Sequence, residues 1–296
     1  MEKINIYFDE KDEIFDICHD EVFKAVFTRD TLESRRALSR LISAFICLDI
    51  TVITINANEP PIDNIRDRQI RFDINCRAET DELIDVEMSL NPDPFELVRL
   101  EFYAGKLFTG QDIKGTDRNY DDLKQSYQIA ILAKEKFFKD KEFSHSFEYY
   151  DPVHGVSLNG KSRIITLELS KLEGIVEKPI DEMSAQELWA VFFKYLPDKD
   201  KRQKINRIIE LEEGIAMASE VLKNISKDEI ERARLMSEYK YAVDLQSKLV
   251  TAKRKGIEEG IQEGIAKGKK ELQNYILDLI EQGFTREEIK KKLEEQ

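Results

Sequence analysis

The chain has 296 residues, of which 35% are charged and 41% hydrophobic, and its formal net charge is -13. This length favours a core domain with an extension, and the hydrophobic fraction is large enough for a buried core. The acidic balance excludes a protein that coats nucleic acid without specificity, because neutralising phosphates requires clustered lysine and arginine. It leaves room for a local basic groove.

Cysteine usage and hydropathy indicate an intracellular protein. Cys18, Cys47 and Cys76 are widely separated and form no C-x-x-C pair, so the sequence encodes neither a disulfide framework nor a zinc site. The first residues lack an apolar stretch of signal-peptide length, and no run approaches the roughly 20 apolar residues that a membrane helix needs. We therefore expect a soluble, cytoplasmic protein with no membrane partner.

The first part of the chain predicts helices and strands in alternation. Apolar residues at helical spacing predict two helices before residue 48, and ITVITINAN at 50–58 predicts a strand. IRFDINCRAETDELIDVEMSLNP at 70–92 predicts a hairpin with its turn centred on Thr80, because apolar and polar residues alternate on both sides. A helix is expected over 95–108, and SYQIAIL (126–132) and RIITLELSKL (163–172) predict two further strands. The strand-rich core should end near residue 175.

The remaining part of the chain predicts helices. Three capping boxes indicate helix starts: Ser184 with Glu187, Ser226 with Glu229, and Thr285 with Glu288. Glycines then recur at every fourth residue, at Gly256, Gly260, Gly264 and Gly268, and an isoleucine directly follows each of the first three. Such a stripe favours either an oligomerisation helix or a frayed, solvated tail, since each interior glycine costs about 1 kcal/mol relative to alanine. Two short helices joined at Gly283 close the sequence.

The predicted hairpin gathers acidic side chains on one face. A turn at Thr80 places Asp73 opposite Glu87 and Asn75 opposite Asp85, while the intervening apolar residues face the core. Like charges directly across a ladder destabilise it unless a cation neutralises them. Mg²⁺ is suited to this role, because it binds carboxylates, waters and phosphate oxygens. The alternative is a half-exposed hairpin with a solvated acidic face.

The order of these features resembles a nuclease superfamily. An acid on one strand, a turn, acid-x-polar on the next strand and then a helix resemble the PD-(D/E)XK nucleases. More narrowly, the chain resembles the Rpn family of recombination-promoting nucleases, which also carries a transposase label, and the glycine-repeat tail occurs in that family too. The resemblance lies in six ordered blocks between about residues 12 and 175: DEVFKAVF (20–27), FDI (72–74), VEMS (86–89), RLEFYAGKLFTGQDIKG (99–115), YDDLKQSYQIAIL (120–132) and ITLELSKL (165–172).

This resemblance implies an α/β fold and a metal-dependent cut in DNA. The implied nuclease-like core, over residues 1–175, is a mixed β-sheet flanked by helices, followed by a helical region at 176–255 and a glycine-repeat tail at 256–296. Asp73 matches the family's first metal-binding acid and Glu87 matches the second, and the backbone carbonyl of Met88 completes the metal ligands. The implied metal is Mg²⁺, or Mn²⁺ in its place. Asp20 matches an early acid of the family, although an aspartate there could also cap its helix.

Ser89 departs from the pattern. The superfamily has lysine at this position and the Rpn family usually has glutamine, and either can orient the attacking water. A serine hydroxyl can bind a water but brings no charge. On the following helix, Arg99, Tyr103 and Lys106 are candidates to replace the missing group, with a solvated charged stripe as the alternative.

Two functions follow from these observations. The first is a Mg²⁺-dependent DNA endonuclease with a basic groove formed by the Arg99 helix and the loop containing Lys114 and Arg118. The second is a non-catalytic interaction protein that keeps the nuclease fold. Either would form a homo-oligomer through its C-terminal helices. The three histidines share no metal-ligand spacing, and Trp189 is predicted to be a helix-core residue.

Overall fold

The computed structural model describes residues 6–56, 71–92, 94–111, 119–158 and 160–294. The chain forms two compact units, Met1–Met236 and Ser237–Gln296.

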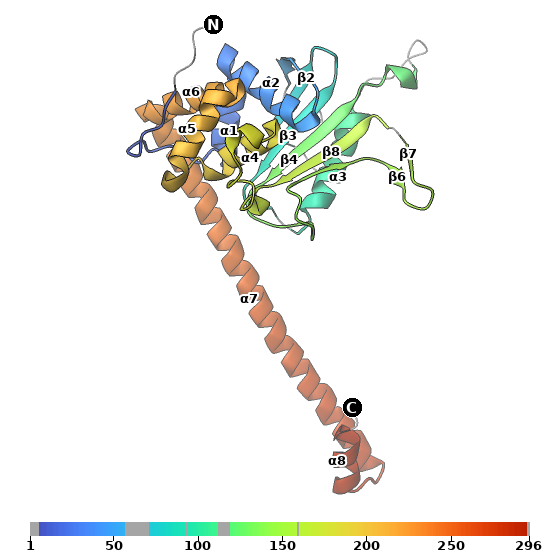
Figure 1. Ribbon diagram of the computed structural model, residues 1–296. Coiled ribbons are helices and arrows are strands. Elements are labelled where there is room, and N and C mark those ends of the chain that lie inside the picture. Colours follow the sequence, from blue (N-terminus) through green and yellow to red (C-terminus); the bar gives the residue numbers. More distant parts are fainter. Residues whose placement is uncertain (1–5, 57–70, 93, 112–118, 159, 295–296) are drawn as a thin grey trace. The chain divides into compact units, whose positions relative to one another are not determined.

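A six-stranded mixed sheet forms the centre of the first unit (Figure 1). The middle strands β3, β4 and β8 are parallel, and the outer strands run antiparallel to their neighbours. In spatial order the strands are β1 (Val52–Ile55), β2 (Ile74–Ala78), β3 (Leu83–Ser89), β4 (Ser126–Leu132), β8 (Ser162–Glu168) and β5 (Ser144–Phe147). A separate two-stranded ribbon pairs β6 (Tyr150–Asp151) with β7 (Val156–Ser157).

The hairpin β2–β3 has the predicted register. Asn75 lies opposite Asp85, and the turn between the strands contains Asp81 in the left-handed region at φ 73°. The alternation of side chains places Ile84, Val86 and Met88 in the main hydrophobic core.

Helices that precede and follow the strands in the sequence cover the face of the sheet on which Ile84, Val86 and Met88 lie (Figure 1). They are α1 (Asp20–Phe27), α2 (Leu32–Ile46), α4 (Ala185–Tyr195), α5 (Arg202–Leu211) and α6 (Glu213–Lys227). Trp189 of α4 is fully buried, as predicted. The compact unit extends to Met236, because α4 to α6 pack into the same core as the sheet. The last strand of the sheet along the chain, β8, ends at Glu168. Four 3-10 turns lie at Tyr120–Asp122, Leu169–Lys171, Ile180–Glu182 and Lys199–Lys201.

Helix α3 (Glu96–Thr109) covers the opposite face, where it connects β3 to the parallel strand β4. Leu100 packs on Ala130 and Leu132 of β4 in a second, smaller core. The acidic face of the hairpin looks toward this layer, and Asp85 and Glu87 are buried beneath it. The alternative of a solvated acidic face is therefore wrong.

One long helix contains the glycine repeat. Helix α7 (Glu229–Glu281) is continuous through all four glycines, and apart from neighbouring residues and the helix's own backbone no heavy atom lies within 4 Å of the position that a Cβ would take at any of them. Ile257, Ile261 and Ile265 are about half exposed. The final helix, α8 (Arg286–Glu294), follows Gly283, whose φ of 87° suits the reversal of the chain.

The helix start predicted at Ser226 falls two residues later, since α6 ends at Lys227 and α7 begins at Glu229. Ser226 lies in the last turn of α6, where its hydroxyl donates to the Leu222 carbonyl. The Ser184 box is present, with the side chains and backbone N–H groups of Ser184 and Glu187 bonded reciprocally. No helix in the described parts of the chain is long and apolar enough to cross a membrane.

Candidate active site

Asp73 and Glu87 are held together by reciprocal bonds to each other's strands. The Asp73 backbone N–H donates to Glu87 Oε1 at 3.0 Å, and the Met88 N–H donates to Asp73 Oδ2 at 3.0 Å. The two residues are only 8% and 2% exposed. Because the bonds come from backbone groups, the register of the hairpin fixes the positions of both carboxylates.

Lys24 brings a positive charge to this pair from α1. Its ammonium lies 2.9 Å from Asp73 Oδ1 and 3.0 Å from Asp20 Oδ1. Asp20 and Lys24 are one helical turn apart, which places them on the same face of α1. Asp20 is the first residue of α1 and His19 is the N-cap, so the alternative that Asp20 caps the helix is wrong.

Arg99 approaches Glu87 from α3. Its Nη2 atom lies 3.7 Å from Glu87 Oε2 and bonds to Glu96 in the first turn of the same helix. The guanidinium also stands over the Tyr103 ring, 5.4 Å from its centroid, and Tyr103 packs edge to face on Phe72. Of the residues predicted on this helix, Arg99 lies beside Glu87, whereas Tyr103 contacts Arg99 and Phe72.

Asp85 adds a third carboxylate to the same face. It is fully buried, and Gln128 of β4 donates to its Oδ2 at 2.6 Å. Its other oxygen, Oδ1, has no hydrogen-bond partner in the described part of the chain. Leaving such an atom unpaired costs about 1–3 kcal/mol, more when the group is charged.

Negative charge exceeds positive charge in this cluster. Burial, together with the charges of Glu87 and Asp20, raises the pKa of Asp73 to about 8, although Lys24 opposes the shift. Burial also raises the pKa values of Glu87, where Arg99 opposes the shift, and of Asp85, where the charge of Glu87 adds to it. Lys24 itself stays charged, because Asp73 and Asp20 raise its pKa in spite of its burial. The cluster therefore favours the uptake of protons or of a further cation.

The donor groups suit a hard divalent cation. Carboxylate and carbonyl oxygens are the ligands that Mg²⁺ and Mn²⁺ prefer. The unpaired Asp85 Oδ1 is a further buried oxygen donor in this cluster. Among the described residues, however, no group of three or more His, Cys, Asp or Glu side chains has an arrangement that could hold a metal ion. Lys24 already pairs with Asp73.

Ser89 ends β3 two residues after Glu87, on the same face of the strand, and its carbonyl accepts the Ala133 N–H at 2.9 Å. Other predicted residues are not placed at the acids. Lys106 is exposed on α3, with its ammonium over the ring of Phe102. Lys114 and Arg118, predicted to complete a basic groove, lie outside the described residues.

Sequence reasoning missed two of the groups that contact the acids. Lys24 could have been found from its spacing, since Asp20 and Lys24 form an i, i+4 pair. Gln128 carries no such signal, because its contact with Asp85 arises only when β4 pairs with β3 in parallel.

The architecture and the site define the class of protein. A mixed sheet flanked by helices, with acids on a central hairpin and a crossover helix after it, is an α/β fold of the PD-(D/E)XK nuclease type. Residues 17–252 match a family described as PD-(D/E)XK nuclease family transposase. The chain belongs to this family, which confirms the expected resemblance. No curated protein and no solved structure matches the chain.

Proposed function

We propose that the protein is a Mg²⁺-dependent DNA endonuclease of the recombination-promoting type. The observation that carries this proposal is the pair Asp73 and Glu87, buried side by side and each bonded to the other's strand. A structural ion pair would need only one acid for each cation, whereas this cluster has acids in excess. We also place the protein in the cytoplasm, where the exposed free thiol of Cys47 would remain reduced.

Asp73, Glu87 and the Met88 carbonyl would hold the metal ion, Mg²⁺ or Mn²⁺. Such an ion lowers the pKa of a bound water and stabilises charge on a phosphate that is being cleaved. Asp20 lies at the edge of this set, joined to Asp73 through Lys24. Its role is to hold the Lys24 ammonium in place.

Lys24 supplies the charge that Ser89 lacks. Its ammonium already lies within 3 Å of Asp73, which is closer than any cation from α3 comes to either metal-binding acid. From there it can orient the attacking water or bind a phosphate oxygen. Arg99, beside Glu87, would bind a second phosphate oxygen as a fixed donor. Ser89 would contribute a hydroxyl to the water, and Tyr103 would support the guanidinium of Arg99.

A plasmid nicking assay tests this proposal. We expect nicking with Mg²⁺, none with EDTA, and a loss of at least about 100-fold in Asp73→Asn and Glu87→Gln, since each removes a metal ligand. Glu21→Gln, which removes an exposed charge next to Asp20, is the matched control and should cleave normally. Absence of metal-dependent cleavage in the wild type, or cleavage that survives both substitutions, would rule the proposal out.

The second candidate is a non-catalytic interaction protein. Ser89 favours it, because the usual water-orienting side chain is missing, and so does the contact of Lys24 with Asp73. In this case Lys24 would neutralise Asp73 permanently. Substitution of Lys24 separates the two: an interaction protein would keep its partner after loss of the charge, whereas the nuclease would lose its activity.

Self-association through the C-terminal helices is proposed for either function. The glycine stripe of α7 leaves a face on which another helix could approach closely, and three half-exposed isoleucines lie beside it. Deletion of residues 256–296 followed by light scattering tests this proposal. An unchanged number of subunits would dismiss it.

A further inference from the structure

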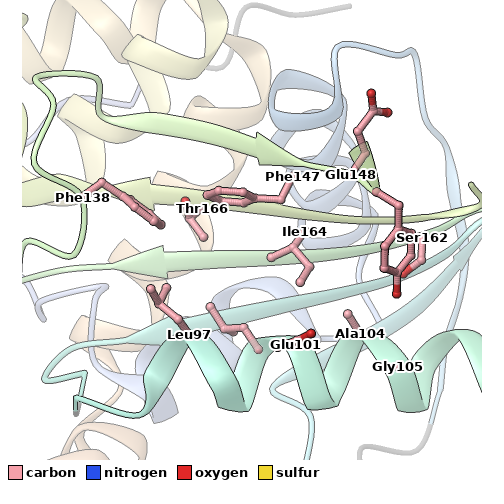
Figure 2. A pocket seen from close by; sticks show the side chains of 12 residues that line it. Leu97, Glu101, Ala104, Gly105, Phe138, Phe147, Glu148, Ser162, Ile164 and Thr166 are labelled. Carbon is pink, nitrogen blue, oxygen red and sulfur yellow. The ribbon is translucent and has the colours of Figure 1, made fainter. Parts of the chain in front are cut away.

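A second concave site lies on the α3 side of the sheet, apart from the acids. It is an open pocket of about 290 Å³ between α3 and the strands β5 and β8 (Figure 2). Helix α3 contributes Leu97, Glu101 and Ala104, which form one stripe, whereas Arg99 and Tyr103 lie on another side of the helix. Neither Arg99 nor the acids of the hairpin line the pocket.

Aromatic rings form one end of this pocket. The rings of Phe138 and Phe147 lie side by side, with centroids 5.3 Å apart and planes inclined by 38° (Figure 2). Tyr149 is largely exposed and also lines the pocket, and Ile164 and Leu97 complete the apolar wall. Apolar walls with exposed rings suit a planar ligand, because such a ligand can stack on them.

The polar groups of the pocket limit the chemistry of the ligand. Thr166 is only 1% exposed, and its hydroxyl has no hydrogen-bond partner among the described residues. Glu101 and Glu148 add carboxylates, and Glu148 is paired with Arg163 at 3.5 Å. None of the residues that line the pocket is Lys, Arg or His. The pocket therefore disfavours a phosphate and favours an uncharged ring that carries N–H donors.

The register of the sheet relates this pocket to the acids. Glu87 lies opposite Ala130, and Ala130 lies opposite Thr166. Two strand spacings separate the backbones of Glu87 and Thr166, which is about 10 Å. That distance corresponds to about three stacked base steps along one nucleic acid strand.

We propose that this pocket binds one unstacked nucleobase of the strand that the enzyme cleaves. The base would stack on Phe147 and Tyr149, and its exocyclic amino group would donate to Glu101 or Glu148, while the Thr166 hydroxyl gains a partner. Adenine, cytosine and guanine carry an exocyclic amino group, whereas thymine offers only its N3–H, so thymine should bind most weakly. This proposal rests on the proposed function in one respect, namely that the base belongs to the DNA strand that the enzyme cleaves.

Binding can be measured without cleavage. Fluorescence anisotropy in EDTA would compare a labelled thymidine oligonucleotide with the same oligonucleotide carrying one central adenine or cytosine, using the full chain. We expect binding to be at least about fivefold tighter with the amino-bearing base. Equal affinity for all three oligonucleotides would overturn the proposal. Because no metal is present, the result does not depend on whether Asp73 and Glu87 support cleavage.

Variants of the pocket test the assignment. Phe147→Ala should weaken binding about 5- to 150-fold, the range for loss of one base stack. Thr166→Val removes only the unpartnered hydroxyl, so it should weaken binding of all three oligonucleotides without lowering the melting temperature. Tyr120→Ala, an exposed aromatic outside the pocket, is the matched control and should bind normally. Unchanged binding in both pocket variants would refute the assignment.

Two further outcomes would also overturn the proposal. If free adenosine binds as tightly as the oligonucleotide, the pocket is a nucleoside site and does not take a base from a strand. If Phe147→Ala changes the number of subunits in light scattering, a second protein chain covers the pocket. If the protein prefers the amino-bearing base but does not nick DNA, the proposed nuclease function is refuted and the base-binding pocket is not.

Discussion

Replacement of Lys24 by methionine tests how the acids are neutralised. The substitution removes the ammonium but keeps an unbranched apolar side chain of similar length. In the wild type this ammonium bonds to Asp73 and Asp20, and the Lys24 side chain is only 18% exposed. Loss of the charge should leave Asp73 buried with no cation in contact, apart from any added metal.

The free-energy change should depend strongly on pH. Asp73 ionises only above its pKa, which is raised to about 8. At pH 9, one pH unit above that pKa, ionisation of Asp73 stabilises the folded wild type by about 1.4 kcal/mol relative to the form with a protonated Asp73. The variant keeps Asp73 protonated instead, so the difference in stability should be about 1.4 kcal/mol larger at pH 9 than at pH 6. At pH 6 Asp73 carries a proton in both proteins, and the difference should fall below about 1 kcal/mol.

Urea unfolding in EDTA at pH 6 and pH 9 measures this difference. Lys24→Arg keeps the charge and serves as the control, with a much smaller pH-dependent loss. In the nicking assay Lys24→Met should lose activity while Lys24→Arg retains part of it. A loss of stability that is the same at both pH values, or no loss at pH 9, would refute the reasoning that Lys24 neutralises Asp73.

Four further expectations concern the acids and the tail. In EDTA, the wild type should lose stability as pH rises from 5 to 8, because the folded state keeps protons that the unfolded state releases. The loss should be up to about 1.4 kcal/mol per pH unit for each such proton. Asp73→Asn should reduce this slope of stability against pH, and an unchanged slope would contradict the raised pKa of Asp73. Mg²⁺ should raise the melting temperature of the wild type but not of Glu87→Gln, and an equal rise in both would place the ion elsewhere. Gln128→Leu should cost about 1–3 kcal/mol in urea unfolding, because Asp85 loses its donor; no loss would mean that Asp85 is satisfied without it. Deletion of residues 256–296 should leave the melting temperature of the Met1–Met236 unit unchanged, and a lower value would show that the tail supports it.

Local periodicity predicted most elements of the first unit. The hairpin was predicted with its register, because its side-chain alternation has one solution that buries Ile84, Val86 and Met88. The two N-terminal helices and α3 were predicted from apolar residues at helical spacing. The capping pattern at Ser226 predicted a helix boundary but misplaced it by two residues, because α6 continues through Ser226 to Lys227 before α7 begins at Glu229. A capping pattern shows that a helix can begin nearby, whereas packing decides the residue at which it does.

The sequence by itself determined that Asp73, Asp85 and Glu87 share one face, since alternation in a strand is a local property. Only the tertiary structure decided that this face is buried, because α3 crosses over it after leaving β3. It also decided that a cation meets Asp73, because α1 packs where Lys24 can reach a residue 49 positions away along the chain. Local pattern carries no information about which distant element covers a face. The environment that raises the pKa of Asp73 therefore arises only when the helices and the sheet pack together.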